Sequence, residues 1–107
     1  MKNNKALSLI GIATKAGKTV AGEFSTEKAV EEGRAYLVVV AENASDNTKK
    51  KFQNMCDYYN VMLKIFSDKD RLGAACGKEF RASLAITDEG LANAVRKQID
   101  HIENLEV

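Results

Sequence analysis

The most obvious candidates for chemistry are Gly17, Lys18 and Thr19, because Gly-Lys-Thr resembles the end of the phosphate-binding loop of nucleotide hydrolases. That loop needs another glycine five positions before Gly17, where this chain has Ile12, and Gly11 is one residue too early. The loop also joins a strand to a helix, whereas here a helical pattern precedes the three residues and a strand pattern follows them. Spacing and context therefore argue against nucleotide hydrolysis.

The other reactive side chains are scattered along the chain. His101 is the single histidine, and the sequence places no serine or cysteine nucleophile to use it. Cys56 and Cys76 show neither a Cys-x-x-Cys spacing nor a partner histidine, so we expect reduced packing residues. Carboxylates such as Glu27 and Glu31 fall at solvent-facing helical positions. The sequence therefore predicts no enzymatic activity, no metal site and no cofactor.

Features that favour nucleic acid coincide at residues 22–28. Gly22 allows close approach of the backbone, and a helix that begins there directs unpaired N–H groups toward a phosphate or a base carbonyl. Phe24, Ser25 and Lys28 are spaced so that a ring, a hydroxyl and an ammonium group share one helical face. An ordinary helix start also favours glycine and serine, and Phe24 could belong to the core, so both interpretations stay open.

The charge distribution is uneven along the chain. The formal net charge is +1, but residues 1–22 hold four lysines and no acid, whereas the last eight residues hold three acids and no lysine or arginine. We expect Lys15 and Lys18 to approach the segment 22–28 and to neutralise phosphates there. A positive face on a nearly neutral protein would attract a polyanion, although ordinary solvated charge gives the same composition.

A second candidate is an apolar segment of small residues that we expect to connect a short helix to the last strand. It comprises Leu72, Gly73, Ala74, Ala75, Cys76, Gly77 and Lys78. Exposed connections are normally polar, and small residues between glycines would let the backbone lie flat against an unstacked base. A helix end packed tightly against the sheet would have the same composition.

Helical and strand patterns alternate along the chain. Apolar residues recur at helical spacing in residues 6–16, 24–32, 46–59 and 88–102, with a short helix after residue 68. Runs typical of strands occupy residues 19–21, 35–41, 61–66 and 83–87. Residues 35–41 are apolar without alternation, as in a central strand covered on both faces. The stripe that we expect to face the core of the third helix consists of Phe52, Met55, Cys56 and Tyr59.

These patterns predict a single α/β domain over residues 1–107. We expect a three-layer α/β/α sandwich around a small, mostly buried mixed sheet of about four strands. No apolar run approaches the roughly 20 residues of a membrane span, and the chain start does not look like a signal peptide. The sequence therefore predicts a cytoplasmic protein with no membrane partner.

An ordered set of motifs makes the chain resemble a known family. The motifs lie at residues 9–18, 20–22, 29–33, 37–45, 47–51, 72–73, 77–78 and 85–90. Together they resemble the kink-turn RNA-binding ribosomal-protein family of the archaeal L-seven-Ae and eukaryotic L-thirty-e type, and most closely its short bacterial YlxQ-like members. The resemblance implies a non-enzymatic protein that binds structured RNA with its second helix and with the connection before its last strand.

The resemblance also concerns single residues. In family members that grip kink-turns, an Asn-Glu pair followed three residues later by lysine reads tandem sheared G·A pairs, and an apolar loop holds a flipped-out nucleotide. Gly22 and Lys28 match the family's glycine and lysine, whereas Phe24 and Ser25 stand at the Asn and Glu positions. RNA binding is therefore implied more strongly than kink-turn specificity.

We predict a monomer that binds structured RNA, in particular ribosomal RNA, with the ribosome or translation factors as further partners. The predicted RNA-binding residues are Lys15, Lys18, Gly22, Phe24, Ser25, Lys28, Leu72, Gly73, Ala74, Ala75, Gly77 and Lys78. The alternative is a protein-interaction module of the same fold that docks a translation factor or another copy of itself with the Phe24 surface. An exposed Phe24 on a positive face would favour RNA, and a flat apolar patch without cations would favour a protein.

Overall fold

A computed structural model describes residues 4–105, in which helices and strands alternate as predicted. In chain order the elements are α1 (Asn4–Lys15), β1 (Thr19–Ala21), α2 (Glu23–Glu31), β2 (Leu37–Val40), α3 (Asp46–Tyr59), β3 (Met62–Ile65), α4 (Lys69–Ala75), β4 (Ser83–Ile86) and α5 (Glu89–Leu105). None of the helices in this part of the chain is both long and apolar enough to cross a membrane.

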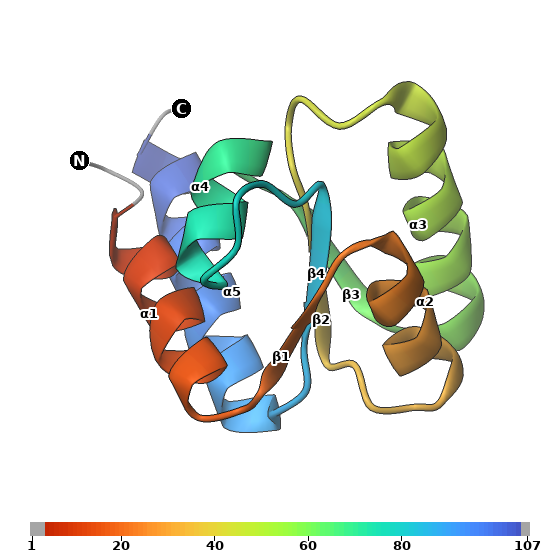
Figure 1. The fold of residues 1–107 in the computed structure, drawn as a ribbon, viewed down its shortest axis with the longest axis horizontal. Helices are drawn as coiled ribbons and strands as arrows, with labels where there is room; N and C mark the ends of the chain where they lie inside the picture. Colours follow the sequence, from red (N-terminus) through yellow and green to blue (C-terminus); the bar gives the residue numbers. More distant parts are fainter. Residues whose placement is uncertain (1–3, 106–107) are drawn as a thin grey trace.

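The sheet lies between two layers of helices (Figure 1). Its four strands are ordered β1-β4-β2-β3; β4 is antiparallel to both of its neighbours, whereas β2 and β3 are parallel. Helices α1, α4 and α5 cover one face, and α2 and α3 cover the other. The predicted three-layer sandwich with a mixed sheet is confirmed.

The core lies on both faces of the two inner strands. Every residue of β2 and β4 is buried, whereas the edge strands β1 and β3 are partly exposed. Helices on both sides remove water from both faces of β2, which explains why residues 35–41 are apolar without alternation. The prediction of a central strand there is confirmed.

Three side chains define where helices begin. Ser45, Asp68 and Asp88 each accept a hydrogen bond from the backbone N–H three residues later, at 3.1, 2.8 and 2.9 Å respectively. Each bond satisfies one N–H group that has no partner inside the helix. Asn60 ends α3 in the left-handed conformation, with φ 58°.

The prediction for the stripe of α3 is wrong at its last position. Phe52 and Cys56 are buried and Met55 is half-buried, but Tyr59 is 42% exposed. Tyr59 is the last residue of the helix, where the chain turns into β3, and its ring packs edge-on against Tyr58 with 4.9 Å between the ring centroids. The end of the helix therefore lies past the part that the sheet covers.

Candidate nucleic-acid interface

The second helix begins at a glycine in a conformation that other residues rarely adopt. Gly22 has φ 104° and ψ 160°, and its N–H donates to the Ser83 carbonyl at the start of β4, at 2.8 Å. A Cβ at this position would lie 3.7 Å from Nε of Arg81. The pairing of β1 with β4 therefore brings the Arg81 side chain next to the start of α2.

The first turn of α2 has free hydrogen-bond donors. No side chain within residues 4–105 caps this helix, so its first N–H groups face outward. The positive end of the helix dipole and the nearby Arg81 guanidinium add favourable potential for an anion. This end of α2 can therefore hold a phosphate or a base carbonyl.

Phe24 and Lys28 share an exposed face of α2, as their spacing predicted. Phe24 is 74% exposed, so it does not belong to the core. The Lys28 ammonium lies 5.8 Å from the centre of the Phe24 ring, within the range of a cation–π contact. Ser25 is half-buried beside them. The structure thus presents an aromatic surface and a positive charge together.

Carboxylates also line this face of α2. A hollow of about 380 Å³ is lined by Phe24, Lys28, Glu27, Glu31 and Glu32. Part of this negative charge is paired, because Glu27 binds Lys51 of α3 at 2.9 Å and Glu32 binds Arg34 at 2.8 Å. The surface around Phe24 therefore carries one basic side chain, Lys28, and three acidic ones, Glu27, Glu31 and Glu32.

The expectation that residues 72–78 form an exposed connection is wrong for their first half. Residues up to Ala75 belong to α4, and Leu72, Gly73 and Cys76 are buried. Leu72 is 0% exposed and cannot touch RNA in this structure. The small-residue composition here reflects tight packing. Gly77 and Lys78 are exposed, as predicted.

Gly73 positions the connection that follows α4. A Cβ on Gly73 would lie 2.4 Å from Cα of Phe80 and 2.8 Å from the Glu79 carbonyl oxygen, both backbone atoms. The connection between α4 and β4 therefore packs directly on the glycine backbone. This contact fixes the position of Phe80 and of the next residue, Arg81.

Phe80 and Arg81 are the site residues that the sequence analysis missed. Phe80 is 59% exposed, and Arg81 lies beside Gly22 with its guanidinium donating to the Phe80 carbonyl at 2.7 Å. Together with Lys78 they place an aromatic ring and two cations on one short connection. The signal in the sequence was this aromatic-arginine pair directly before the last strand.

The expectation that Lys18 approaches Gly22 is wrong. The Lys18 carbonyl accepts from the N–H of Thr87, beyond the end of β4, whereas Gly22 pairs with Ser83 at the start of β4. The two residues therefore lie at opposite ends of β1. Extended backbone advances about 3.3 Å per residue, so a short separation along the chain becomes a wide separation in space.

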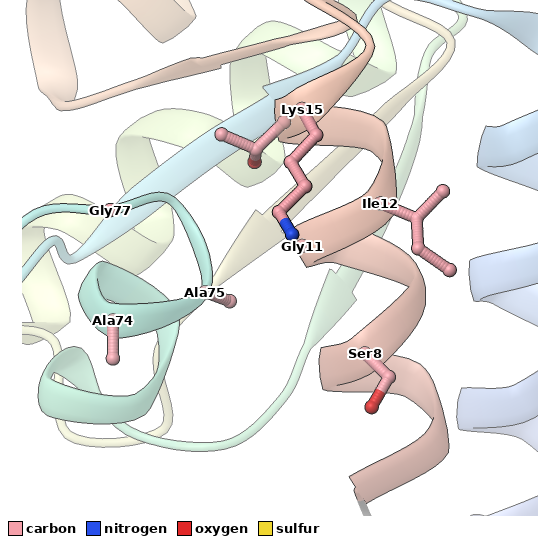
Figure 2. A pocket seen from close by; sticks show the side chains of 8 residues that line it. Ser8, Gly11, Ile12, Lys15, Ala74, Ala75 and Gly77 are labelled. Carbon is pink, nitrogen blue, oxygen red and sulfur yellow. The ribbon is translucent and has the colours of Figure 1, made fainter.

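Lys15 lies apart from both Lys18 and Gly22. It borders a groove of about 460 Å³ between α1 and α4, and Figure 2 shows its side chain extending along α1 toward Gly11. Ala74, Ala75 and Gly77 line the same groove from the α4 side. The structure thus groups these predicted residues with each other, and the Gly22 surface forms a separate group.

The remaining reactive side chains lie on different elements. His101 is exposed on α5, and Cys56 and Cys76 are buried and unpaired with each other. Burial raises the pKa of the Cys56 thiol to about 11, so the thiol stays protonated at neutral pH. Among residues 4–105, no group of three or more His, Cys, Asp or Glu side chains is placed to hold a metal ion.

Fold and surface together define a small α/β/α sandwich that gathers aromatic and basic side chains where α2 and β4 begin. Comparison with known proteins agrees with this class. Residues 4–96 match the ribosomal protein L7Ae/L30e/S12e/Gadd45 family. The chain belongs to this family.

Two relatives illustrate the match in sequence. The chain is 41% identical over 92 residues to the RNA-binding protein YlxQ of Bacillus subtilis, which covers 86% of this chain and 92% of that protein. It is 38% identical over 80 residues to the large ribosomal subunit protein eL30 of Methanoregula boonei, which covers 73% of this chain and 79% of that protein. The predicted membership and the likeness to YlxQ are confirmed.

Two solved structures match the fold. A protein of unknown function from Bacillus halodurans superposes with a TM-score of 0.87 at 34% identity, covering 90% of this chain and 97% of that chain. The 15.5kD RNA binding protein of Giardia lamblia superposes with a TM-score of 0.78 at 23% identity, covering 98% and 91%. The fold is therefore that of the family over nearly the whole chain.

Proposed function

We propose that this protein is a non-enzymatic, ribosome-associated protein that binds structured RNA. The proposal includes ribosomal RNA as the target, a monomer as the active form, the cytoplasm as the place of action, and the whole chain as one RNA-binding domain. The family match and the name of the YlxQ relative support RNA as the ligand. The region that we assign to RNA is the surface around Gly22.

One observation carries this assignment. The pairing of β1 with β4 places the uncapped start of α2 beside Arg81, with exposed aromatic rings at Phe24 and Phe80 on the two segments that meet there. Donors and cations suit phosphates, and exposed rings suit unpaired bases. Such a combination is expected of a surface that grips a bulged or sharply bent RNA.

Each group has a distinct part in the proposed contact. Lys28, Arg81 and Lys78 neutralise phosphates, and the first N–H groups of α2 donate to the RNA backbone or to a base edge. Phe24 and Phe80 stack on unpaired bases, an interaction worth about 1–3 kcal/mol per base. Ser25 contributes a hydroxyl beside Phe24 and Lys28.

The proposed specificity is for shape. Phe24 and Ser25 lack the amide and carboxylate with which kink-turn binders of this family read G·A pairs. Stacking tolerates any base, since every base has a π-face. We therefore propose recognition of a bulged or kinked backbone with little preference for the bases beside it.

Crosslinking in cells followed by sequencing of the bound RNA tests the function. Recovery of ribosomal RNA at one or a few structured positions is the expected result. Recovery of no RNA above background, together with a protein partner in stoichiometric amount, would refute it. In vitro, Arg81→Ala should weaken binding to a bulged RNA hairpin, while Lys97→Ala on the opposite helical layer should not.

A second candidate function follows from the acidic side of Phe24. The ring is 74% exposed and borders the hollow that also contains Glu27, Glu31 and Glu32. An exposed ring beside carboxylates suits a basic protein segment better than it suits RNA. If Phe24→Ala abolishes binding to a ribosomal protein or a translation factor but leaves RNA binding intact, this candidate is preferred.

A further inference from the structure

Two carboxylates stand directly beside the proposed RNA surface. Glu23 is the first residue of α2, next to Gly22, and Glu27 lies one turn later, next to Lys28. A carboxylate in the first turn of a helix is attracted to the same N–H groups that would bind a phosphate. Left unrestrained, these side chains would compete with RNA for its own binding site.

A single lysine of the neighbouring helix holds both of them. The Lys51 ammonium lies 2.7 Å from Oε2 of Glu23 and 2.9 Å from Oε1 of Glu27. Its hydrogen bonds to Glu23 and then to Glu27 raise the pKa of Lys51 above its ordinary value. Lys51 belongs to α3, so the two carboxylates are held toward that helix.

We propose that Lys51 is a positioning residue for RNA binding: it holds Glu23 and Glu27 against α3 and thereby keeps the uncapped start of α2 and Lys28 free for phosphate. This inference rests on the proposed function and adds to it a residue that does not itself touch RNA. The three side chains form an ion-pair group whose integrity controls access to the site.

A distinction from direct phosphate binding follows from this geometry. If Lys51 contacted RNA, its removal would cost the same affinity whatever stands at positions 23 and 27. If it acts by restraining carboxylates, its removal costs affinity only while those carboxylates are present. A double-mutant cycle separates the two cases, because it measures whether the effects depend on each other.

The experiment measures binding of the full chain to a synthetic RNA hairpin with a bulge and tandem G·A pairs. Lys51→Met should weaken binding about fivefold at about 50 mM monovalent salt, and the loss should shrink toward zero at about 0.5 M, where charges are screened. In a Glu23→Gln/Glu27→Gln background, Lys51→Met should change affinity by less than about twofold. Lys51→Arg, which preserves the ion pairs, should bind like the wild type.

Lys97→Met is the matched control, because it removes one lysine from α5 on the opposite layer. Circular dichroism and melting temperature check that each variant folds, and exposed ion pairs contribute little to stability. The inference is overturned if Lys51→Met lowers RNA affinity equally in both backgrounds, or does not lower it in the wild-type background. Either result leaves the proposed RNA-binding function intact. If the wild type binds neither this hairpin nor any cellular RNA, the proposed function itself fails.

Discussion

Gly73→Ala is a stringent test of how the RNA surface is built. The new Cβ would lie 2.4 Å from Cα of Phe80 and 2.8 Å from both the Phe80 nitrogen and the Glu79 carbonyl oxygen. Ordinary contacts of a Cβ begin at about 3.4 Å, so the backbone of the connection must retreat by about 1 Å. No flexible side chain can absorb this displacement, since all three atoms belong to the backbone.

The cost follows from this displacement. Overpacking of a well-packed interior destabilises a protein by about 1–3 kcal/mol. For a domain of this size each kcal/mol lowers the melting temperature by about 4–8 °C. The shift also displaces Phe80 and Arg81 relative to the start of α2, and we expect RNA affinity to fall about fivefold or more, as for a lost base stack.

Thermal denaturation and a gel-shift titration measure the two effects separately. Gly33→Ala is the matched control: Gly33 has φ 74°, and a Cβ added there would meet no atom within 4 Å, so the variant is strained without moving Phe80. The control should melt earlier and bind RNA normally. If Gly73→Ala melts within about 1 °C of the wild type and binds RNA equally well, the packing explanation is refuted.

Three further predictions concern single positions. Lys28→Ala should weaken binding to a bulged RNA and reduce the slope of log affinity against log salt by about one unit; an unchanged slope would remove Lys28 from the phosphate contacts. Gly22→Ala should lower the free energy of unfolding by about 1–3 kcal/mol, because φ 104° strains any residue other than glycine. Gly11→Ala is its control: the new Cβ meets nothing nearer than 3.7 Å, so thermal denaturation should show unchanged or higher stability. The hydrogen bond from Lys64 holds the pKa of Asp100 below its ordinary 3.8. The ionised Asp100 carboxylate therefore stabilises the folded state at neutral pH, and this contribution is lost as the pH falls below that value. Asp100→Asn should show a smaller drop in melting temperature between pH 7 and pH 3 than the wild type.

The sequence predicted the fold well because each element carries its own local signal. Helical spacing, capping residues such as Ser45 and Asp68, and the apolar run of β2 all act within one or two turns of chain. The contiguous part of the candidate site was found for the same reason. Gly22, Phe24 and Lys28 lie within two turns of α2, so their spacing alone places them together.

The parts of the site that depend on strand pairing were not predictable. Arg81 reaches Gly22 because β1 pairs with β4, a contact between residues about 60 positions apart that no local pattern reveals. Lys18 lies at the other end of β1 from Gly22, because the extended strand between them carries the chain away from it. Leu72 was included wrongly because small residues favour both an open loop and a close-packed helix.

The strand order has a consequence for synthesis of the protein. β4 lies between β1 and β2, so β1 has no strand to pair with until residues 83–86 have left the ribosome. The N–H of Gly22 then gains its acceptor on Ser83 at the same step that brings Arg81 alongside. A nascent or truncated chain that ends before β4 therefore carries the exposed residues of α2 without a formed surface. The proposed RNA surface thus forms only after β4 has been made.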